Sequence, residues 1–337
     1  MRAAVHDWVR RWWNEDAGRS GNLASIVAAP FEMLYRLGLT TRNRRYDRGR
    51  GVQEPELPVV SVGNLTVGGT GKTPFSAWVV RLLVQSGLRP VLLARGYGQD
   101  ELQLHREWNP SVPVLAGADR ALLAREAARR GADSAVLDDG FQHRALARSV
   151  DIVLLAAEDP FPGALLPRGP YREPTHALGR AHVVVVTRRT ASWARAAALA
   201  GTVRTTWPHL RVGVAALEPG EWRDLDGRRV EAPRGSLLAA AAVARPEDFR
   251  VQASTETGVD VDLVPFPDHH RFSERDVRGL RARAGSRTLV VTEKDAVKLR
   301  AFGSILGPVR VLTQTLRWEE GEDAVRALIL GAVREAR

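Results

Sequence analysis

The chain has 337 residues, of which 44% are hydrophobic and 26% charged, as in an ordinary soluble globular protein of about two domains. It contains no cysteine, which excludes disulfides and thiolate metal sites. There is no apolar run of the roughly 20 residues that span a bilayer and no signal-peptide pattern, so we expect a cytosolic protein. The net charge of +10 indicates an anionic partner, which could be nucleic acid, an anionic membrane or a phosphorylated substrate.

The first 50 residues are basic and rich in tryptophan. They hold ten arginines against five acidic residues, and Trp8, Trp12 and Trp13 fall at helical spacing. An apolar stretch at 22–39 and the basic run at 41–50 follow. Tryptophan and leucine surrounded by arginine are typical of a helix that lies in a membrane interface. A pair of amphipathic helices packed on the protein, with a solvated basic face, explains the pattern equally well.

Residues 61–74, SVGNLTVGGTGKTP, predict a strand followed by a glycine-rich phosphate-binding loop and a helix. Glycines let backbone N–H groups approach phosphate oxygens, and the start of the following helix adds positive potential. Lysine occurs only at positions 72, 294 and 298, whereas arginine is the default cation, so a lysine in this loop is informative. The alternative is a plain glycine turn between strand and helix. The loop residues are Thr66, Val67, Gly68, Gly69, Thr70, Gly71, Lys72 and Thr73.

A second candidate element is the apolar strand SAVLDD, which ends in Asp138 and Asp139. Downstream of a phosphate-binding loop, an aspartate at a strand end is the element that holds Mg²⁺. Thr73 offers a hydroxyl to the same ion. An ordinary Asp-Gly turn is the competing interpretation.

Apolar runs alternate with helical patterns through the middle of the chain, which predicts an α/β fold with a parallel sheet covered by helices, of the P-loop NTPase type. Around 205–233 the pattern predicts a β-hairpin linker with turns at Pro219-Gly220 and Asp226-Gly227. A second, smaller α/β domain follows. We therefore expect an N-terminal helical region at 1–50, a P-loop domain at 51–210, a β linker at 211–233 and a C-terminal domain at 234–337. The predicted strands are Pro58–Val62, Pro90–Ala94, Val112–Leu115, Ala135–Leu137, Ile152–Ala156 and Val183–Thr187, with helices near 72–86 and 119–130.

Six segments occur in a characteristic order: SVGNLTVGGTGKTP, ARGYG (94–98), LDDGFQH (137–143), LPRGPYREP (166–174), FPDHHRF (266–272) and TEKDAVKL (292–299). Together they resemble the tetraacyldisaccharide 4′-kinase family, the lipid A 4′-kinases of Gram-negative bacteria, over almost the whole chain. The loop with Thr66 in place of the usual first glycine is similar to the family's own form. The resemblance implies ATP- and Mg²⁺-dependent phosphorylation of an acylated disaccharide 1-phosphate by an enzyme bound peripherally to the cytoplasmic face of the inner membrane. It implies neither a nucleic-acid partner nor an obligate protein partner.

The resemblance also implies roles for individual residues. Asp100 and His269 correspond to a proton-accepting pair, although the spacer after GYG is shorter than in the family and leaves Glu101 as an alternative base. Lys72 and Asp139 belong to the catalytic set, and Glu173 to the metal ligands with Thr73, Asp138 and Asp139. The residues expected beside the substrate or its phosphates are Arg120, Gln142, His143 and Arg172.

Three other functions remain open on the sequence alone. Another P-loop kinase or ATPase would explain the loop and Asp139 but not the N-terminal region or His269. A nucleic-acid-dependent ATPase would explain the charge, yet no helix-turn-helix, RNP-type or zinc-finger pattern accompanies it. A membrane-peripheral scaffold with an inactive nucleotide site predicts binding without turnover.

Overall fold

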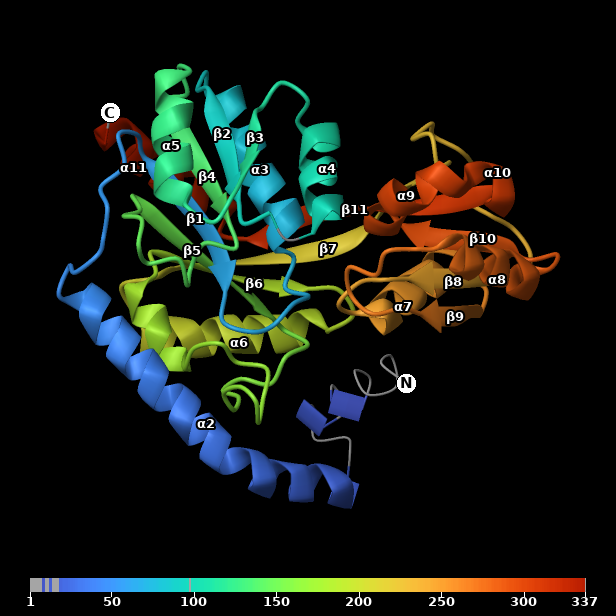
Figure 1. The fold of residues 1–337 in the computed structure, drawn as a ribbon, viewed down its shortest axis with the longest axis horizontal. Coiled ribbons are helices and arrows are strands. Elements are labelled where there is room, and N and C mark those ends of the chain that lie inside the picture. The colour runs from blue at the N-terminus through green and yellow to red at the C-terminus, as the bar shows by residue number, and fades with distance from the viewer. Residues whose placement is uncertain (1–7, 10–11, 14–17, 97, 337) are drawn as a thin grey trace.

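The computed structural model describes residues 8–9, 12–13, 18–96 and 98–336. Its backbone is one 11-stranded sheet with the order β3-β2-β4-β1-β5-β6-β7-β11-β10-β8-β9. The sheet passes through two lobes, a larger one built on β1–β7 and a smaller one built on β8–β10 (Figure 1). Neighbouring strands within each lobe are parallel, and the antiparallel pair β7–β11 joins the lobes. The α/β fold expected from the sequence is confirmed.

The six strands predicted for the larger lobe are all present, with ends shifted by at most two residues. They are continuous in apolar residues because helices cover both faces of the sheet. The larger lobe contains β1 (Val59–Asn64), β2 (Pro90–Ala94), β3 (Val114–Ala116), β4 (Ser134–Asp138), β5 (Val150–Ala156), β6 (Val183–Arg188) and β7 (Arg211–Arg223). The remaining strands are β8 (Leu237–Ala241), β9 (Val261–Pro265), β10 (Thr288–Thr292) and β11 (Val309–Glu320).

Helices cover both faces of the sheet in each lobe. On the larger lobe, α3 and α11 pack on the face that carries Val60 and Val62, while α5, α6 and the end of α2 cover the opposite face. On the smaller lobe, α7 covers one face and α8, α9 and α10 the other. The helices are α2 (Gly18–Asp47), α3 (Lys72–Gln85), α4 (Gln99–Trp108), α5 (Arg120–Arg129), α6 (Trp193–Thr206), α7 (Pro246–Thr257), α8 (Glu274–Ala284), α9 (Glu293–Leu299), α10 (Gly303–Leu306) and α11 (Glu322–Glu335).

The segment expected as a hairpin linker begins with the long strand β7 and turns back only after Arg223, where Arg229 forms an antiparallel bridge with Arg223. Pro219-Gly220 lies inside β7 and pairs with β11, far along the chain, so the predicted turn there is wrong. Gly220 is required by close packing, since a Cβ at that position would stand 2.5 Å from the hydroxyl of Thr313. Pro219 is tolerated because it sits beside a register shift in β11. The predicted turn at Asp226-Gly227 does form, with Gly227 at φ 85°.

The C-terminal helix α11 returns to the larger lobe. Val325, Ile329 and Val333 are fully buried in the core that also contains Val60 and Phe75. The chain therefore crosses between the lobes twice, once along β7 and once along β11. Two extended strands that share a hydrogen-bonded ladder form this connection.

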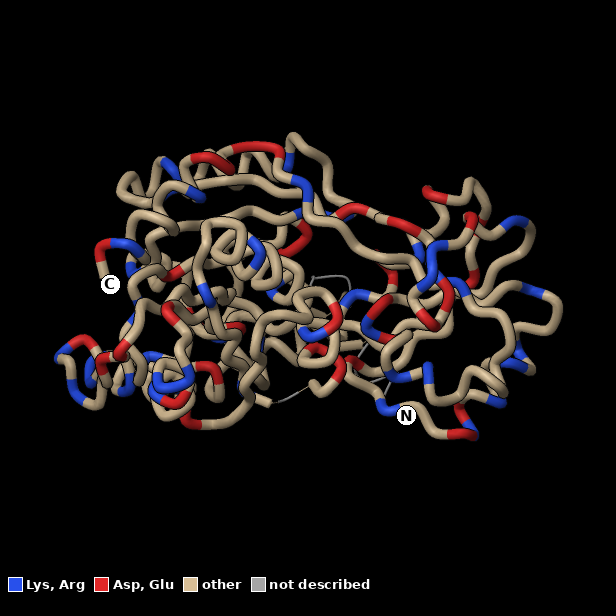
Figure 2. Tube along the Cα trace, turned by 90° about the horizontal axis from the view of Figure 1, so that it is seen from above, with Lys and Arg blue, Asp and Glu red and all other residues tan. Residues whose placement is uncertain are grey.

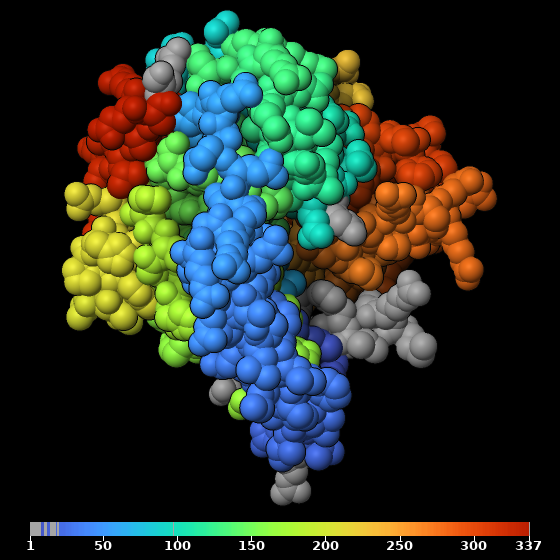
Figure 3. Space-filling view, turned by 60° about the vertical axis from the view of Figure 1, so that its left-hand side comes forward, coloured from blue at the N-terminus to red at the C-terminus, as the bar shows by residue number. Residues whose placement is uncertain are grey.

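Helix α2 lies across one face of the larger lobe, and its N-terminal half projects beyond the body of the protein (Figure 3). It presents many apolar side chains to solvent, whereas Ala28, Leu39 and the carboxylate of Glu32 are buried against the protein. Glu32 accepts a hydrogen bond from the Leu165 amide at 3.2 Å. No helix among the described residues is long and apolar enough to cross a membrane. The exposed apolar side chains of α2 are Leu23, Ile26, Val27, Phe31, Met33, Leu34 and Leu37.

The tryptophans before α2 contact the protein itself. Trp12 donates a hydrogen bond to the Ser25 hydroxyl at 2.7 Å, and Trp13 donates to the carbonyl of Pro167 at 3.0 Å. Both side chains are half-buried. Arg10 and Arg11, two of the ten arginines of the N-terminal region, lie outside the described residues.

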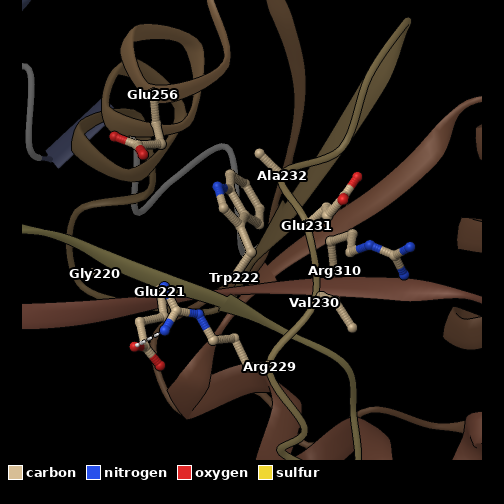
Figure 4. Close-up of a pocket in the computed structure, with 9 residues that line it drawn as sticks. All are labelled: Gly220, Glu221, Trp222, Arg229, Val230, Glu231, Ala232, Glu256 and Arg310. Atoms are coloured by element: carbon tan, nitrogen blue, oxygen red, sulfur yellow. Dashed lines mark ion pairs between the residues drawn. The ribbon is translucent and has the colours of Figure 1, made fainter.

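Basic and acidic positions are interspersed over both lobes (Figure 2). A groove of about 860 Å³ lies on the smaller-lobe side of β7, where Trp222, Glu256 and Arg310 surround it and Arg229 pairs with Glu221 at 3.3 Å (Figure 4). It contains none of the residues predicted from the sequence to act in the site.

Candidate active site

The phosphate-binding loop connects the buried end of β1 to the first turn of α3. Gly68, Gly69 and Gly71 have φ angles of 68°, 71° and 86°, a region that glycine adopts without strain. Gly71 is the residue immediately before the helix, so the free amides of the first turn point toward the loop. The geometry fits a phosphate group, because backbone donors and the positive end of a helix converge there.

Lys72 lies in a cluster of polar groups at the carboxyl ends of β1 and β4. Its Nζ is 3.1 Å from Asn64 Oδ1 and 3.6 Å from Asp139 Oδ1. Arg172 binds both carboxylate oxygens of Asp139, at 2.9 and 3.1 Å, and also donates to Asn64. Burial would raise the pKa of Asp139, but the charges of Lys72 and Arg172 lower it well below its usual range. Asp139 is therefore a carboxylate between two cations.

The two adjacent aspartates have different environments. Asp138 is buried, accepts hydrogen bonds from Ser76 at 2.8 Å and from its neighbour's amide at 3.1 Å, and lies 3.3 Å from His105 Nε2. Both of its carboxylate oxygens are thus engaged by the protein. Asp139 has a positive φ of 52°, which turns its side chain toward Lys72 and the loop. Of the pair, Asp139 is the better placed to contact a metal or a metal-bound water.

Glu173, expected among the metal ligands, has other partners. It is fully buried and accepts hydrogen bonds from Arg180 at 3.0 Å and from Asn43 of α2 at 3.1 Å. Within the described chain, no group of three or more His, Asp or Glu side chains forms a cluster that could hold a metal. Mg²⁺ in phosphoryl-transfer enzymes is held by one or two carboxylates together with phosphates and water, and Thr73 and Asp139 fit that role.

Gln142 and His143 lie beside the same cluster. The side-chain amide of Gln142 donates to the main-chain carbonyl of Asn64 at 2.9 Å. The main-chain carbonyl of Gln142 accepts from Arg42 of α2 at 2.6 Å. His143 Nδ1 is 3.1 Å from Arg120, which is buried. Burial and the neighbouring guanidinium groups of Arg120 and Arg148 lower the pKa of His143 to about 4. His143 is therefore neutral near pH 7 and accepts a hydrogen bond from Arg120.

Asp100 and His269 meet across the boundary between the lobes. Asp100 follows the start of α4, His269 follows β9, and the distance between Asp100 Oδ1 and His269 Nδ1 is 3.1 Å. Gly98 permits this approach, because a Cβ at its φ of 74° would stand 2.8 Å from the imidazole ring. Asp268, the neighbour of His269, lies 4.0 Å from the point where a Cβ of Gly68 would stand. The pair therefore sits next to the phosphate-binding loop.

The protonation of this pair follows from its surroundings. Burial would raise the pKa of Asp100, but the hydrogen bond from His269 and the charges of Lys294 and Lys298 lower it well below its usual range. The same hydrogen bond raises the pKa of His269, while burial and Lys294 act in the opposite direction. Asp100 is therefore ionised near pH 7.

Sequence reasoning missed several residues of this site. Asn64 ends β1 inside the quoted loop motif, and its position at a strand end was the available signal. His105 is buried behind Asp138, and only the fold brings it there. Lys294 and Lys298 carried one signal, the rarity of lysine, which was applied to Lys72 alone.

Comparison with known proteins gives a consistent result. The sequence profile of the tetraacyldisaccharide-1-P 4′-kinase family matches residues 24–105 and 99–334. A tetraacyldisaccharide 4′-kinase of Anaeromyxobacter dehalogenans (strain 2CP-C) is 39% identical over 94% of this chain and 93% of its own length. The enzyme of that name from Anaeromyxobacter sp. (strain Fw109-5) is 41% identical over 92% of this chain and 93% of its own length.

Among solved structures, LpxK from Aquifex aeolicus in complex with ATP is similar with a TM-score of 0.71 and 26% identity. The match covers 92% of this chain and 99% of that one. The family profile spans nearly all of the described residues, and the phosphate-binding loop, Asp139 and the Asp100–His269 pair lie together within the matched part. The chain therefore belongs to the tetraacyldisaccharide-1-P 4′-kinase family and is an ATP-dependent kinase.

Proposed function

We propose that this protein transfers the γ-phosphoryl group of Mg-ATP to the 4′-hydroxyl of a tetraacylated glucosamine disaccharide 1-phosphate, a step of lipid A biosynthesis. The observation that carries the proposal is the Asp100–His269 pair beside the phosphate-binding loop. Phosphoryl transfer needs groups that neutralise the phosphates and a group that receives the proton of the attacking hydroxyl. Lys72 and the loop amides would supply the first, and the Asp100–His269 pair beside the loop would supply the second.

The loop amides and Lys72 would bind the β- and γ-phosphates, and Mg²⁺ would contact Thr73 and Asp139 and supply charge neutralisation. Asp138, whose oxygens are taken by Ser76 and His105, would hold the strand end and the amide of Asp139 in place. Because Arg172 binds Asp139 in a bidentate manner, it would orient that carboxylate and stand ready for a phosphate oxygen. Glu173 would fix Arg180 rather than bind metal.

Asp100 is a better candidate for the base than Glu101. Its Oδ1 accepts a hydrogen bond from His269, which no side-chain oxygen of Glu101 does among the described residues, and its Oδ2 is buried 3.4 Å from Lys298 Nζ. Glu101 is bound by Lys294 at 3.0 Å. His269 would keep Asp100 oriented and share the incoming proton, so the two would act as one unit.

Arg120, Gln142 and His143 would contact the acceptor sugar or its phosphate. Gln142 contacts both Arg42 of α2 and Asn64, and Arg120 faces His143. An acceptor anchored near α2 would therefore meet Gln142 on its way to Lys72 and Asp139. We further propose that the two lobes act as separate domains joined by β7 and β11, with the acceptor and ATP bound between them.

The proposed membrane contact is the apolar face of α2. Its exposed side chains recur at three- and four-residue intervals from Leu23 to Leu37, and Ile26 and Leu34 are 71% and 65% exposed. Arg44, Arg45, Arg48 and Arg50 are exposed at the C-terminal end of the helix and would meet anionic lipid headgroups. This arrangement suits an enzyme that remains peripheral on the cytoplasmic face of the inner membrane. Moving an acylated acceptor into water would cost about 0.8 kcal/mol per CH₂ group.

Substitution of Ile26, Leu34 and Leu37 by glutamine is expected to release the protein from vesicles that contain anionic phospholipid, because the apolar contact is lost. The same variant should show a raised KM for the lipid acceptor and an unchanged affinity for ATP. Co-sedimentation and steady-state kinetics measure the two effects. Leu122→Gln, at a side chain that is 56% exposed on α5, is the matched control. Vesicle binding by the triple variant equal to that of Leu122→Gln would place the membrane contact elsewhere.

The competing function, a P-loop ATPase or a kinase for small molecules, is tested by acceptor dependence. We expect ATP consumption in detergent to depend on the acylated disaccharide 1-phosphate and to match product formation mole for mole. ATP turnover that is equally fast without this acceptor would contradict the proposal.

A further inference from the structure

All three lysines of the chain lie at the candidate active site. The sequence has 49 lysine and arginine residues together, and lysine stands only at positions 72, 294 and 298. Lys72 belongs to the phosphate-binding loop, whereas Lys294 and Lys298 lie on α9 of the smaller lobe. The other 46 positions of this kind are arginine, so the lysines at these two sites are informative.

Lys298 faces Asp100 Oδ2, the carboxylate oxygen that does not contact His269. Its Nζ is 3.4 Å from Asp100 Oδ2 and 3.0 Å from Asp295 Oδ1, and it lies 5.5 Å from the centre of the Phe272 ring. Asp100 Oδ2 has no hydrogen-bond partner in the described chain. Lys298 is therefore the cation that faces the Asp100 oxygen on the side away from His269.

Lys294 faces the other end of the pair. Its Nζ is 3.4 Å from His269 Nε2, 3.0 Å from Glu101 Oε1 and 3.2 Å from Asp268 Oδ1. An ammonium group can only donate, so a contact with Nε2 favours the tautomer of neutral His269 that carries its proton on Nδ1. That proton is then directed to Asp100 Oδ1, at 3.1 Å.

We propose that Lys294 and Lys298 are positioning residues of the proton-accepting pair, which hold the Asp100 carboxylate in place and His269 in one tautomer. The inference rests on the function proposed for Asp100 and His269. In the transfer step, the 4′-hydroxyl oxygen forms a bond to the γ-phosphorus, the bond to the ADP oxygen breaks, and the hydroxyl proton goes to Asp100. Neither lysine exchanges a proton in this step.

The inference predicts a specific pH dependence. The groups that face the pair are Glu101 on α4, Asp268 beside His269, and Lys294, Asp295 and Lys298 on α9. The pair is active only without its extra proton, and nearby positive charge disfavours that proton. Removal of a lysine charge should therefore move the acidic limb of the kcat/KM profile to higher pH, by on the order of one unit.

The test compares Lys294→Met and Lys298→Met with Lys298→Arg in the full-length enzyme with Mg-ATP and acceptor. Each methionine variant should lose about tenfold in kcat/KM on the acidic limb and regain it near the top of the profile, since one pH unit corresponds to a factor of ten. Lys298→Arg keeps the positive charge, so the acidic limb of its kcat/KM profile should coincide with that of the wild type. NMR titration of labelled histidine should show a higher pKa for His269 in Lys294→Met, a result that requires no turnover.

Arg300→Met is the matched control. Arg300 follows α9 and pairs with Glu107 of α4 at 2.7 Å, so it crosses the same boundary without facing Asp100. An unshifted limb and an unchanged His269 pKa in the methionine variants would overturn the inference and leave the lysines as contacts between the lobes. If a methionine variant does not fold by circular dichroism, the glutamine variant at that position is measured under the same criteria. Full activity of Asp100→Asn and His269→Ala would refute the proposed base itself, which is a distinct outcome.

Discussion

Replacement of Lys72 by methionine is expected to lower kcat by about 10³-fold or more, within the range found when a preorganised donor to transition-state charge is removed. Lys72 begins α3 and points toward Asn64 and Asp139 at the end of the loop. Its ammonium group would neutralise charge that develops between the β- and γ-phosphates. Methionine keeps an unbranched side chain, one atom shorter, and removes the charge. Single-turnover kinetics with saturating Mg-ATP measures the effect on the chemical step.

The Lys72 variant should remain folded. Asp139 keeps its bidentate contact with Arg172, so no carboxylate is left without a partner. Arg81→Met removes an exposed cation from the same helix and serves as the control for a simple change of charge. Equal kcat values for Lys72→Met and Arg81→Met would show that the loop lysine takes no part in phosphoryl transfer.

The second large effect is expected at the proton-accepting pair. Asp100→Asn and His269→Ala should each lower kcat by about 10²- to 10⁴-fold, the usual contribution of general base catalysis. The double variant should lose much less than the product of the two, because residues that act as a unit are not additive. Rates near neutral pH for the single and double variants, each with circular dichroism as a check of folding, provide the comparison.

Glu101→Gln separates the two candidate bases. Glu101 is bound to Lys294 and does not contact His269 in any hydrogen bond of the structure's described part, so this variant should be mild. A severe Glu101→Gln together with a mild Asp100→Asn would show that the base has been assigned one residue too early. Full additivity of the Asp100 and His269 variants would assign them separate roles.

The phosphate-binding loop could be predicted because its determinants are local. A buried strand, the pair Gly68-Gly69 and the triplet Gly71-Lys72-Thr73 follow one another between Val59 and Thr73, and the structure has them in that order. Asp139 could be predicted for the same reason, as the end of an apolar strand. The contacts of Lys298 with Asp100 and of Lys294 with Glu101 could not, because they join α9 to residues almost 200 positions away.

At Pro219-Gly220 the sequence predicted a local feature, a turn, that the structure does not contain. Proline followed by glycine is a strong local turn signal. Here the pairing of β7 with β11 outweighs it, and Gly220 serves close contact with Thr313 and Thr315. Local chemistry also placed the N-terminal membrane contact at the tryptophans. In the structure Trp12 and Trp13 are half-buried against the protein, and the exposed apolar side chains lie on α2.

The most direct test of the central claim is the position of the new phosphate in the product. The purified protein is incubated in detergent with Mg-ATP and a tetraacylated glucosamine disaccharide 1-phosphate, and the product is examined by ³¹P NMR and mass spectrometry. The account predicts a bisphosphorylated disaccharide with the added phosphate on the 4′-oxygen, formed by the wild-type enzyme and not by Lys72→Met. A product phosphorylated elsewhere, or ATP hydrolysis without any phosphorylated lipid, would contradict it.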